Sequence, residues 1–207
     1  LTEHRPFVGR RAELAQVERI LEACRAEQRG QVVVLRGEAG IGKTRLVERI
    51  ADEAAGRGLS PLRVEILDFG TGRGQDPART LVRGLLDLDA DADPGVRVAA
   101  LGAVAARVDF DHATRAHVDD LLDLPADPVR TAYFDALDVE TRTQGRHDAL
   151  AALLRAATAR APRLIVIEDA HWADASTLGD MAALARTTAE IPAVLVATTR
   201  VEGDRCD

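Results

Sequence analysis

One short run of residues constrains the fold of this chain more than any other: Gly37-Glu38-Ala39-Gly40-Ile41-Gly42-Lys43-Thr44. Its spacing fits G-x-x-x-x-G-K-[ST], the pattern of a phosphate-binding P-loop. The apolar residues 31–36 before it predict a buried strand, and the amphipathic residues 45–51 after it predict a helix. Strand, glycine loop and helix form the structural context that this pattern requires, so we expect a nucleotide-binding α/β fold.

The positive charge inside this run is chemically distinctive. Of the 27 basic side chains, all except Lys43 are Arg. A lysine ammonium is a compact point charge on a flexible stem, whereas the guanidinium of Arg is broad and planar. Glycines let backbone N–H groups turn inward as an anion nest, and the helix N-terminus adds further donors. We expect residues 37–45, Arg45 included, to bind ATP or ADP, with Lys43 on the β and γ phosphates and the Thr44 hydroxyl on Mg²⁺.

Composition places the chain among soluble globular proteins, since 46% of its residues are hydrophobic and 29% are charged. The net charge of −7, without a basic block, argues against direct contact with nucleic acid. No apolar run approaches the roughly 18 residues of a membrane span, and the N-terminus lacks a signal-peptide profile. Cys24 and Cys206 are isolated, with no disulfide framework. A cytoplasmic location without membrane contact is therefore predicted.

Apolar periodicity predicts a P-loop NTPase-type parallel sheet flanked by helices, because strands alternate with helices along the chain. Residues 164–167 are uniformly apolar, as in a strand that is covered on both faces. Residues 69–75 are glycine-rich and are expected to form a loop. Besides the strand at 31–36, the pattern predicts strands at 62–67, 164–167 and 193–197, and helices at about 11–28, 43–56 and 175–187.

A long helical region separates the second and third predicted strands. Residues from about 77 to 160 have helical periodicity, with helices expected near 77–87, 96–107, 113–123, 128–137 and 146–160. We interpret residues 1–207 as a single P-loop ATPase domain that contains this helical insertion. A P-loop sheet usually has one more strand and often a helical lid, so the chain is interpreted as a fragment of a longer multidomain protein.

Two acidic residues follow the third predicted strand. A P-loop needs a carboxylate for the magnesium shell and, for hydrolysis, one that polarises water. Counted from the apolar residues, Glu168 takes the magnesium position and Asp169 the water-activating position, although Asp is usual in the first and Asp169 alone is an alternative for both duties. The competing interpretation is an acidic pair at a solvated strand end.

The fourth predicted strand ends in Thr198-Thr199-Arg200. A polar group there is positioned to lie beside the γ-phosphate and to distinguish ATP from ADP, and an Arg fork meets phosphate oxygens bidentately. Arg200 is therefore a candidate catalytic residue. The alternative is a strand that ends in polar residues, with Arg200 in solvent.

Taken together, these segments resemble the ATPase domain of the STAND class, the AAA-like signalling ATPases. Phe7-Val8-Gly9-Arg10 resembles the N-terminal signature that packs near adenine, and residues 37–44 match Walker A. Residues 166–174 resemble the Walker B segment of large LuxR-type transcription regulators and some multidomain nucleotide cyclases. Residues 198–200 resemble the sensor arginine motif. The resemblance adds Val8, Gly9 and Arg10 to the expected nucleotide-binding residues.

This resemblance implies an ATP- and Mg²⁺-dependent switch in signalling or transcription regulation. The implied partners are ATP or ADP, other domains of the same longer chain, and further copies of the protein in a homo-oligomer on activation. Completion of the transition state is expected to need another Arg, from a second subunit or a lid. One expectation for His171 is that it contacts the γ-phosphate or relays nucleotide state to a neighbouring loop. The other is that His171 orients the carboxylates and Trp172 packs the start of the next helix.

Two other functions remain open from the sequence. One is a regulatory scaffold that binds nucleotide without hydrolysing it. The other is a P-loop kinase of small molecules, which needs a lid with catalytic Arg residues and an acceptor pocket in the region 77–160. The acidic strand end and the Thr-Thr-Arg sequence favour the ATPase over the kinase.

Overall fold

The computed structural model describes residues 11–67 and 76–201 of the chain. Val8, Gly9 and Arg10, which were predicted to lie near adenine, fall outside the described residues. The predicted glycine-rich loop 69–75 also falls outside them.

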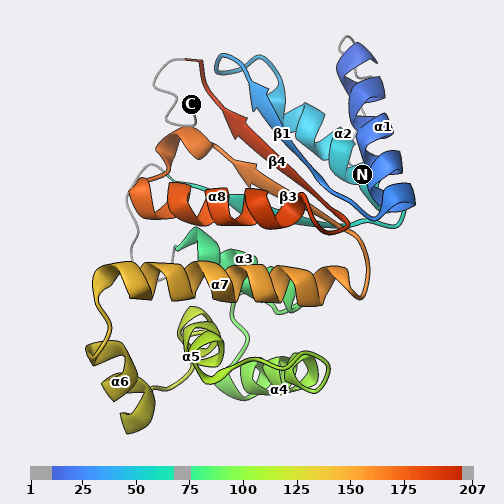
Figure 1. Ribbon diagram of the computed structural model, residues 1–207. Coiled ribbons are helices and arrows are strands. Elements are labelled where there is room, and N and C mark those ends of the chain that lie inside the picture. The colour runs from blue at the N-terminus through green and yellow to red at the C-terminus, as the bar shows by residue number, and fades with distance from the viewer. Residues whose placement is uncertain (1–10, 68–75, 202–207) are drawn as a thin grey trace.

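A four-stranded parallel sheet organises the fold, as the sequence predicted (Figure 1). The strands follow the spatial order β1-β4-β3-β2, so one strand separates the P-loop strand β1 from the acidic strand β3. Each predicted strand is present, with ends shifted by a few residues at most. The bounds are β1 (Gln31–Arg36), β2 (Ser60–Glu65), β3 (Arg163–Glu168) and β4 (Ala193–Thr199).

Helices cover both faces of the sheet and create two separate cores. Because successive strand residues point to opposite faces, Leu164 and Val166 of β3 pack with α1 (Arg11–Glu27) and α2 (Lys43–Gly56). Ile165 and Ile167 pack on the other side, where α8 (Ala175–Thr188) and α7 (Val139–Thr158) lie in successive layers (Figure 1). The P-loop helix α2 therefore shares one face of the sheet with α1.

The insertion between β2 and β3 is helical throughout its described elements. Each helix begins directly after an Asp whose carboxylate accepts a hydrogen bond from a backbone N–H of the first turn, which is the usual N-terminal cap. Helix α7 begins earlier than the predicted residue 146 because Asp138 caps a first turn whose one apolar residue, Val139, is exposed and gives no helical periodicity. The other bounds are α3 (Pro77–Leu85), α4 (Pro94–Ala105), α5 (His112–Leu121) and α6 (Pro128–Asp135).

Strand β1 was predicted to be buried, and this prediction is wrong. The strand lies at one end of the sheet order, and Val32 and Val34 are 43% and 48% exposed. Val33 and Leu35 point the other way and pack against the core formed with α1 and α2. A run of four apolar residues looks the same in sequence whether its two faces are covered or only one.

A partly buried cation, Arg146, joins three helices on the α8 face. The guanidinium of Arg146 in α7 donates to both carboxylate oxygens of Asp180 in α8, at 2.8–3.1 Å, and to both oxygens of Asp76, at 2.8 and 2.9 Å. Asp76 in turn caps α3 through the N–H of Ala78. Burial alone would lower the pKa of Arg146, but hydrogen bonds and charge from Asp180 and Asp76 raise it above its usual value.

Replacement of Arg146 tests whether this contact holds the insertion on the sheet. We expect Arg146→Met to lower the free energy of unfolding by about 3–5 kcal/mol, because the buried Asp180 loses its counter-charge. Urea denaturation measures the change. Arg155→Met is the matched control: Arg155 pairs with Glu190 on the surface, and its loss should cost at most about 1 kcal/mol. Equal effects of the two changes would contradict this account of Arg146.

Candidate nucleotide-binding site

The glycine loop leaves the first turn of α2 without a side-chain cap. Gly40 and Gly42 have φ angles of 77° and 91°, in the left-handed region that glycine enters without strain. Gly42 occupies the N-cap position of α2 and offers no side-chain acceptor. Helices α3 to α8 are each capped by an Asp carboxylate instead. The backbone N–H donors at the start of α2 are thus positioned for an external anion.

Lys43 lies back over the loop that it follows in sequence. Its Nζ donates to the carbonyl oxygen of Gly37 at 2.6 Å and to that of Glu38 at 3.0 Å. Gly37 is buried, and a Cβ there would lie 3.0 Å from Cγ2 of Ile41. The loop therefore holds the ammonium close to its own backbone, where a phosphate on the loop would meet it.

Strand β4 connects the loop to the acidic end of β3. The N–H of Gly37 donates to the carbonyl oxygen of Thr199 at 3.3 Å. The N–H of Asp169 donates to Oγ1 of Thr198 at 3.0 Å. Both threonines are buried. Two motifs far apart in the sequence are thus anchored to adjacent residues of one strand.

Glu168 forms an ion pair that the sequence did not predict. Its Oε1 accepts hydrogen bonds from the Arg63 guanidinium, at 3.0 Å from Nε and also from Nη2. Alternation along β3 puts Glu168 on the same sheet face as Val166, which packs toward α2. Glu65 lies opposite Glu168 in the register of β2 and β3. Arg63 could be found only by knowing that register, since nothing in its local sequence marks it.

Asp169 is more accessible than Glu168. Its side chain is 38% exposed, against 12% for Glu168. Its φ of 56° is left-handed, a conformation that Asp tolerates better than most residues. Nδ1 of the buried His171 lies 3.8 Å from Oδ1 of Asp169, next to the carboxylate that His171 was predicted to orient.

The remaining predicted residues gather beside this strand end. Trp172, which was predicted to pack the start of the next helix, is 39% exposed. The capping of α8 is done by Asp174, which accepts from the N–H of Thr177 at 2.8 Å. That hydrogen bond lowers the pKa of Asp174. Cζ of Arg200 lies 5.7 Å from the centroid of the Trp172 ring.

The donor atoms at this edge of the sheet suit a hard cation. Thr44 is exposed in the first turn of α2, and it supplies a hydroxyl, while Asp169 and Oε2 of Glu168 supply carboxylate oxygens. Mg²⁺ in proteins takes few protein ligands and completes its shell with phosphate oxygens and water. These residues therefore fit a Mg²⁺ that arrives with nucleotide.

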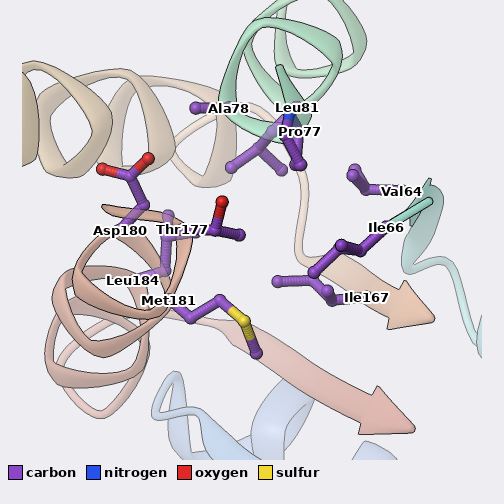
Figure 2. Close-up of a pocket in the computed structure, with 10 residues that line it drawn as sticks. All are labelled: Val64, Ile66, Pro77, Ala78, Leu81, Ile167, Thr177, Asp180, Met181 and Leu184. Atoms are coloured by element: carbon purple, nitrogen blue, oxygen red, sulfur yellow. The ribbon is translucent and has the colours of Figure 1, made fainter. Parts of the chain in front are cut away.

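A small apolar pocket nearby is too small to hold a nucleotide. It encloses about 20 Å³, which is room for about one water molecule. Ile167 of β3 points into it from the α8 face, opposite the α2 face on which Glu168 lies (Figure 2). The pocket is a packing gap between the sheet, α3 and α8, lined by Val64, Ile66, Pro77, Ala78, Leu81, Ile167, Thr177, Asp180, Met181 and Leu184.

A parallel sheet, a glycine loop opening an uncapped helix, and an acidic strand end linked to that loop together define a P-loop nucleotide-binding fold. Residues 6–196 match the AAA ATPase domain family, and the chain belongs to that family. Family membership indicates nucleotide binding and supports an ATPase activity.

One relative comes from Rhizobium meliloti and is itself an uncharacterized protein. It is 27% identical over 198 residues, which cover 94% of this chain and 18% of the relative. The chain thus spans less than a fifth of the length of that relative. Within residues 11–67 and 76–201, no helix combines the length and apolar character needed to cross a membrane.

Gly42→Ala tests the backbone conformation of the loop. No heavy atom lies within 4 Å of a Cβ built at Gly42, so the cost is conformational and not a steric clash. We expect a loss of about 1–2 kcal/mol of stability, measured by urea denaturation, because a left-handed φ strains an L side chain. Gly56→Ala, at the end of the same helix with equally open space, should be neutral or stabilising. A Gly42→Ala protein as stable as the Gly56→Ala protein would refute the conformational requirement.

Proposed function

We propose that this domain binds ATP with Mg²⁺, hydrolyses it slowly, and acts as a nucleotide-controlled switch in a signalling or transcription-regulating protein. The observation that carries the proposal is the anchoring of both motifs on β4. Gly37 of the loop bonds to Thr199, and Asp169 of the acidic strand end bonds to Thr198. A phosphate bound at the loop would therefore lie at the edge of the sheet where the acidic residues end β3.

Each residue of the proposed site has a separate task. Lys43 and the loop N–H groups stabilise negative charge on the phosphates. The Thr44 hydroxyl holds Mg²⁺, which, when bound, supplies positive charge to the phosphate oxygens. Asp169, the more exposed acid, orients and deprotonates the attacking water. Arg200 contacts the γ-phosphate, and a further Arg from a second subunit or a lid completes the charge stabilisation.

The ion pair with Arg63 limits what Glu168 can do. Its Oε1 is engaged by two N–H groups of the guanidinium, so Oε2 is the oxygen left for the magnesium shell. A single available oxygen suits a contact through water better than a direct bidentate one. Asp169 accordingly carries more of the acidic chemistry than its position in the motif alone suggests.

The switch rests on connections that lead away from the site. Asp169 is followed by η1 (Ala170–Trp172) and then by α8, whose Asp180 is bound to Arg146. Arg146 also binds Asp76 at the start of α3. A shift of the β3 end with nucleotide state would thus reach the helical insertion. The small share of the Rhizobium meliloti relative that the chain covers is in keeping with one module among several.

Lys43→Ala tests nucleotide binding directly. We expect MgATP affinity, measured by calorimetry, to fall by about ten- to hundredfold, the effect of one or two lost charged hydrogen bonds. Arg49→Ala, which removes an exposed cation from the same helix, should leave affinity unchanged. As a second measurement, MgATP should protect the single lysine side chain from acylation, followed by mass spectrometry. Unchanged affinity in Lys43→Ala would overturn the proposal.

The double change Glu168→Gln, Asp169→Asn separates an ATPase from a scaffold. We expect nucleotide binding to persist while phosphate release falls by roughly 10²–10⁴-fold, the usual contribution of a positioned base. Glu190→Gln, which changes an exposed acid in the turn between α8 and β4, is the control and should release phosphate normally. If the unmutated protein binds ATP tightly and releases no phosphate, the scaffold function replaces the ATPase.

The kinase alternative is not favoured by the helical insertion. A cavity of about 680 Å³, large enough for a small acceptor, lies among α5, α6 and α7 and is lined by residues that include His117, Arg130 and Arg142. Helices α5 and α6 lie on the side of α7 that faces away from the sheet (Figure 1). The cavity also extends to Ser176 in the first turn of α8, whereas the P-loop helix α2 packs on the other face of the sheet. None of residues 37–45 lines the cavity, so it gives the kinase no specific support.

A further inference from the structure

The guanidinium of Arg200 lies over the exposed aromatic ring of Trp172. Its Cζ lies 5.7 Å from the centroid of Trp172, within the range of a cation–π contact. The indole is itself supported by His171, whose ring centroid lies 4.8 Å away. His171 is buried, whereas Trp172 is 39% exposed. The partly exposed Trp172 ring thus lies in contact with both a buried His ring and the Arg200 guanidinium.

The two residues come from neighbouring strand ends. Trp172 ends η1, which directly follows Asp169 after β3, and Arg200 directly follows β4. Between them, the N–H of Asp169 donates to Thr198 Oγ1 at 3.0 Å. The stack therefore forms a second bridge across the same pair of strands, at the edge where the nucleotide phosphates are proposed to lie.

Stacking and phosphate binding use different parts of a guanidinium. A guanidinium that lies face-on over an aromatic ring keeps its N–H groups available as donors in its own plane. A long Arg side chain loses rotamer freedom when it binds a ligand, and restricting it beforehand reduces that loss. A ring held beside Arg200 would therefore prepare it for a phosphate without competing for its donors.

We propose that Trp172 is a positioning residue, which holds Arg200 by stacking in an orientation that favours the γ-phosphate of ATP. The proposal rests on the proposed function and adds to it the source of discrimination between ATP and ADP. Arg200 makes the contact with phosphate, and Trp172 acts only through Arg200.

The test compares the affinities of MgADP and of Mg²⁺ with a non-hydrolysable ATP analogue, both by calorimetry. Removal of the ring in Trp172→Leu should lower the preference for the triphosphate by about two- to fivefold, the equivalent of one exposed cation–π contact. Trp172→Phe, which retains a weaker aromatic face, should keep part of the preference. If Trp172 had only a structural role, its replacement would lower the affinities for both nucleotides alike and leave the ratio of the two affinities unchanged.

A double-mutant cycle shows whether Trp172 acts through Arg200. On an Arg200→Gln background, Trp172→Leu should have no further effect on the ratio of the two affinities. Arg142→Gln is the matched control, because Arg142 stacks on Phe134 at 5.5 Å, on the insertion, away from the loop. That change should leave the ratio as it is in the unmutated protein.

Trp172 also provides a signal that needs no variant, since it is the one tryptophan of the chain. Its fluorescence should respond to the triphosphate analogue more than to ADP, because only the triphosphate engages the stacked guanidinium. An unchanged or increased preference for triphosphate in Trp172→Leu, with binding still dependent on Lys43, overturns this inference and leaves the proposed function intact. Absence of any nucleotide binding by the unmutated protein overturns both.

Discussion

The position of β4 between β1 and β3 is the constraint on which the candidate site depends. Parallel strands bring their carboxyl ends to one edge of a sheet, but β1 and β3 are not neighbours. Their ends are connected because β4 accepts a hydrogen bond from each side, at Thr199 from Gly37 and at Thr198 from Asp169. Both acceptors are buried, so these bonds form in a dry environment, where losing one is costly. These two bonds are the structural basis for the coupling that we propose between the two motifs.

Helix termini show how this chain separates structure from ligand binding. Asp carboxylates cap α3 to α8 and satisfy backbone donors locally. An Asp at the start of α2 would take the same donors and repel a phosphate by its charge. Gly42 does neither, and its left-handed conformation turns the chain into the helix without a side chain. Of the two kinds of helix start, the glycine loop before α2 was predicted from sequence, whereas the Asp caps were not.

Sequence patterns were sufficient for local structure and insufficient for contacts between elements. The P-loop, every strand and the parallel sheet were predicted, since each depends on neighbouring residues and on alternation. The exposure of Val32 and Val34 depends on where β1 lies in the sheet, which no local pattern records. The pairing of Arg63 with Glu168 likewise requires the register of β2 against β3. The helix α7 was predicted to start near residue 146 and starts at Val139, because its first turns contain too few apolar residues to give a helical periodicity.

The use of Arg and Lys follows the same division between structure and function. Arg63 and Arg146 bind carboxylates, where a planar fork forms several directed hydrogen bonds at once. Such pairing neutralises much of their charge. Lys43 instead donates to backbone carbonyl oxygens of Gly37 and Glu38, which carry no net charge. Its ammonium thus keeps its full positive charge within reach of a phosphate. An Arg at this position would be larger and would favour a carboxylate partner, so a chain that otherwise uses Arg has a physical reason to keep lysine here.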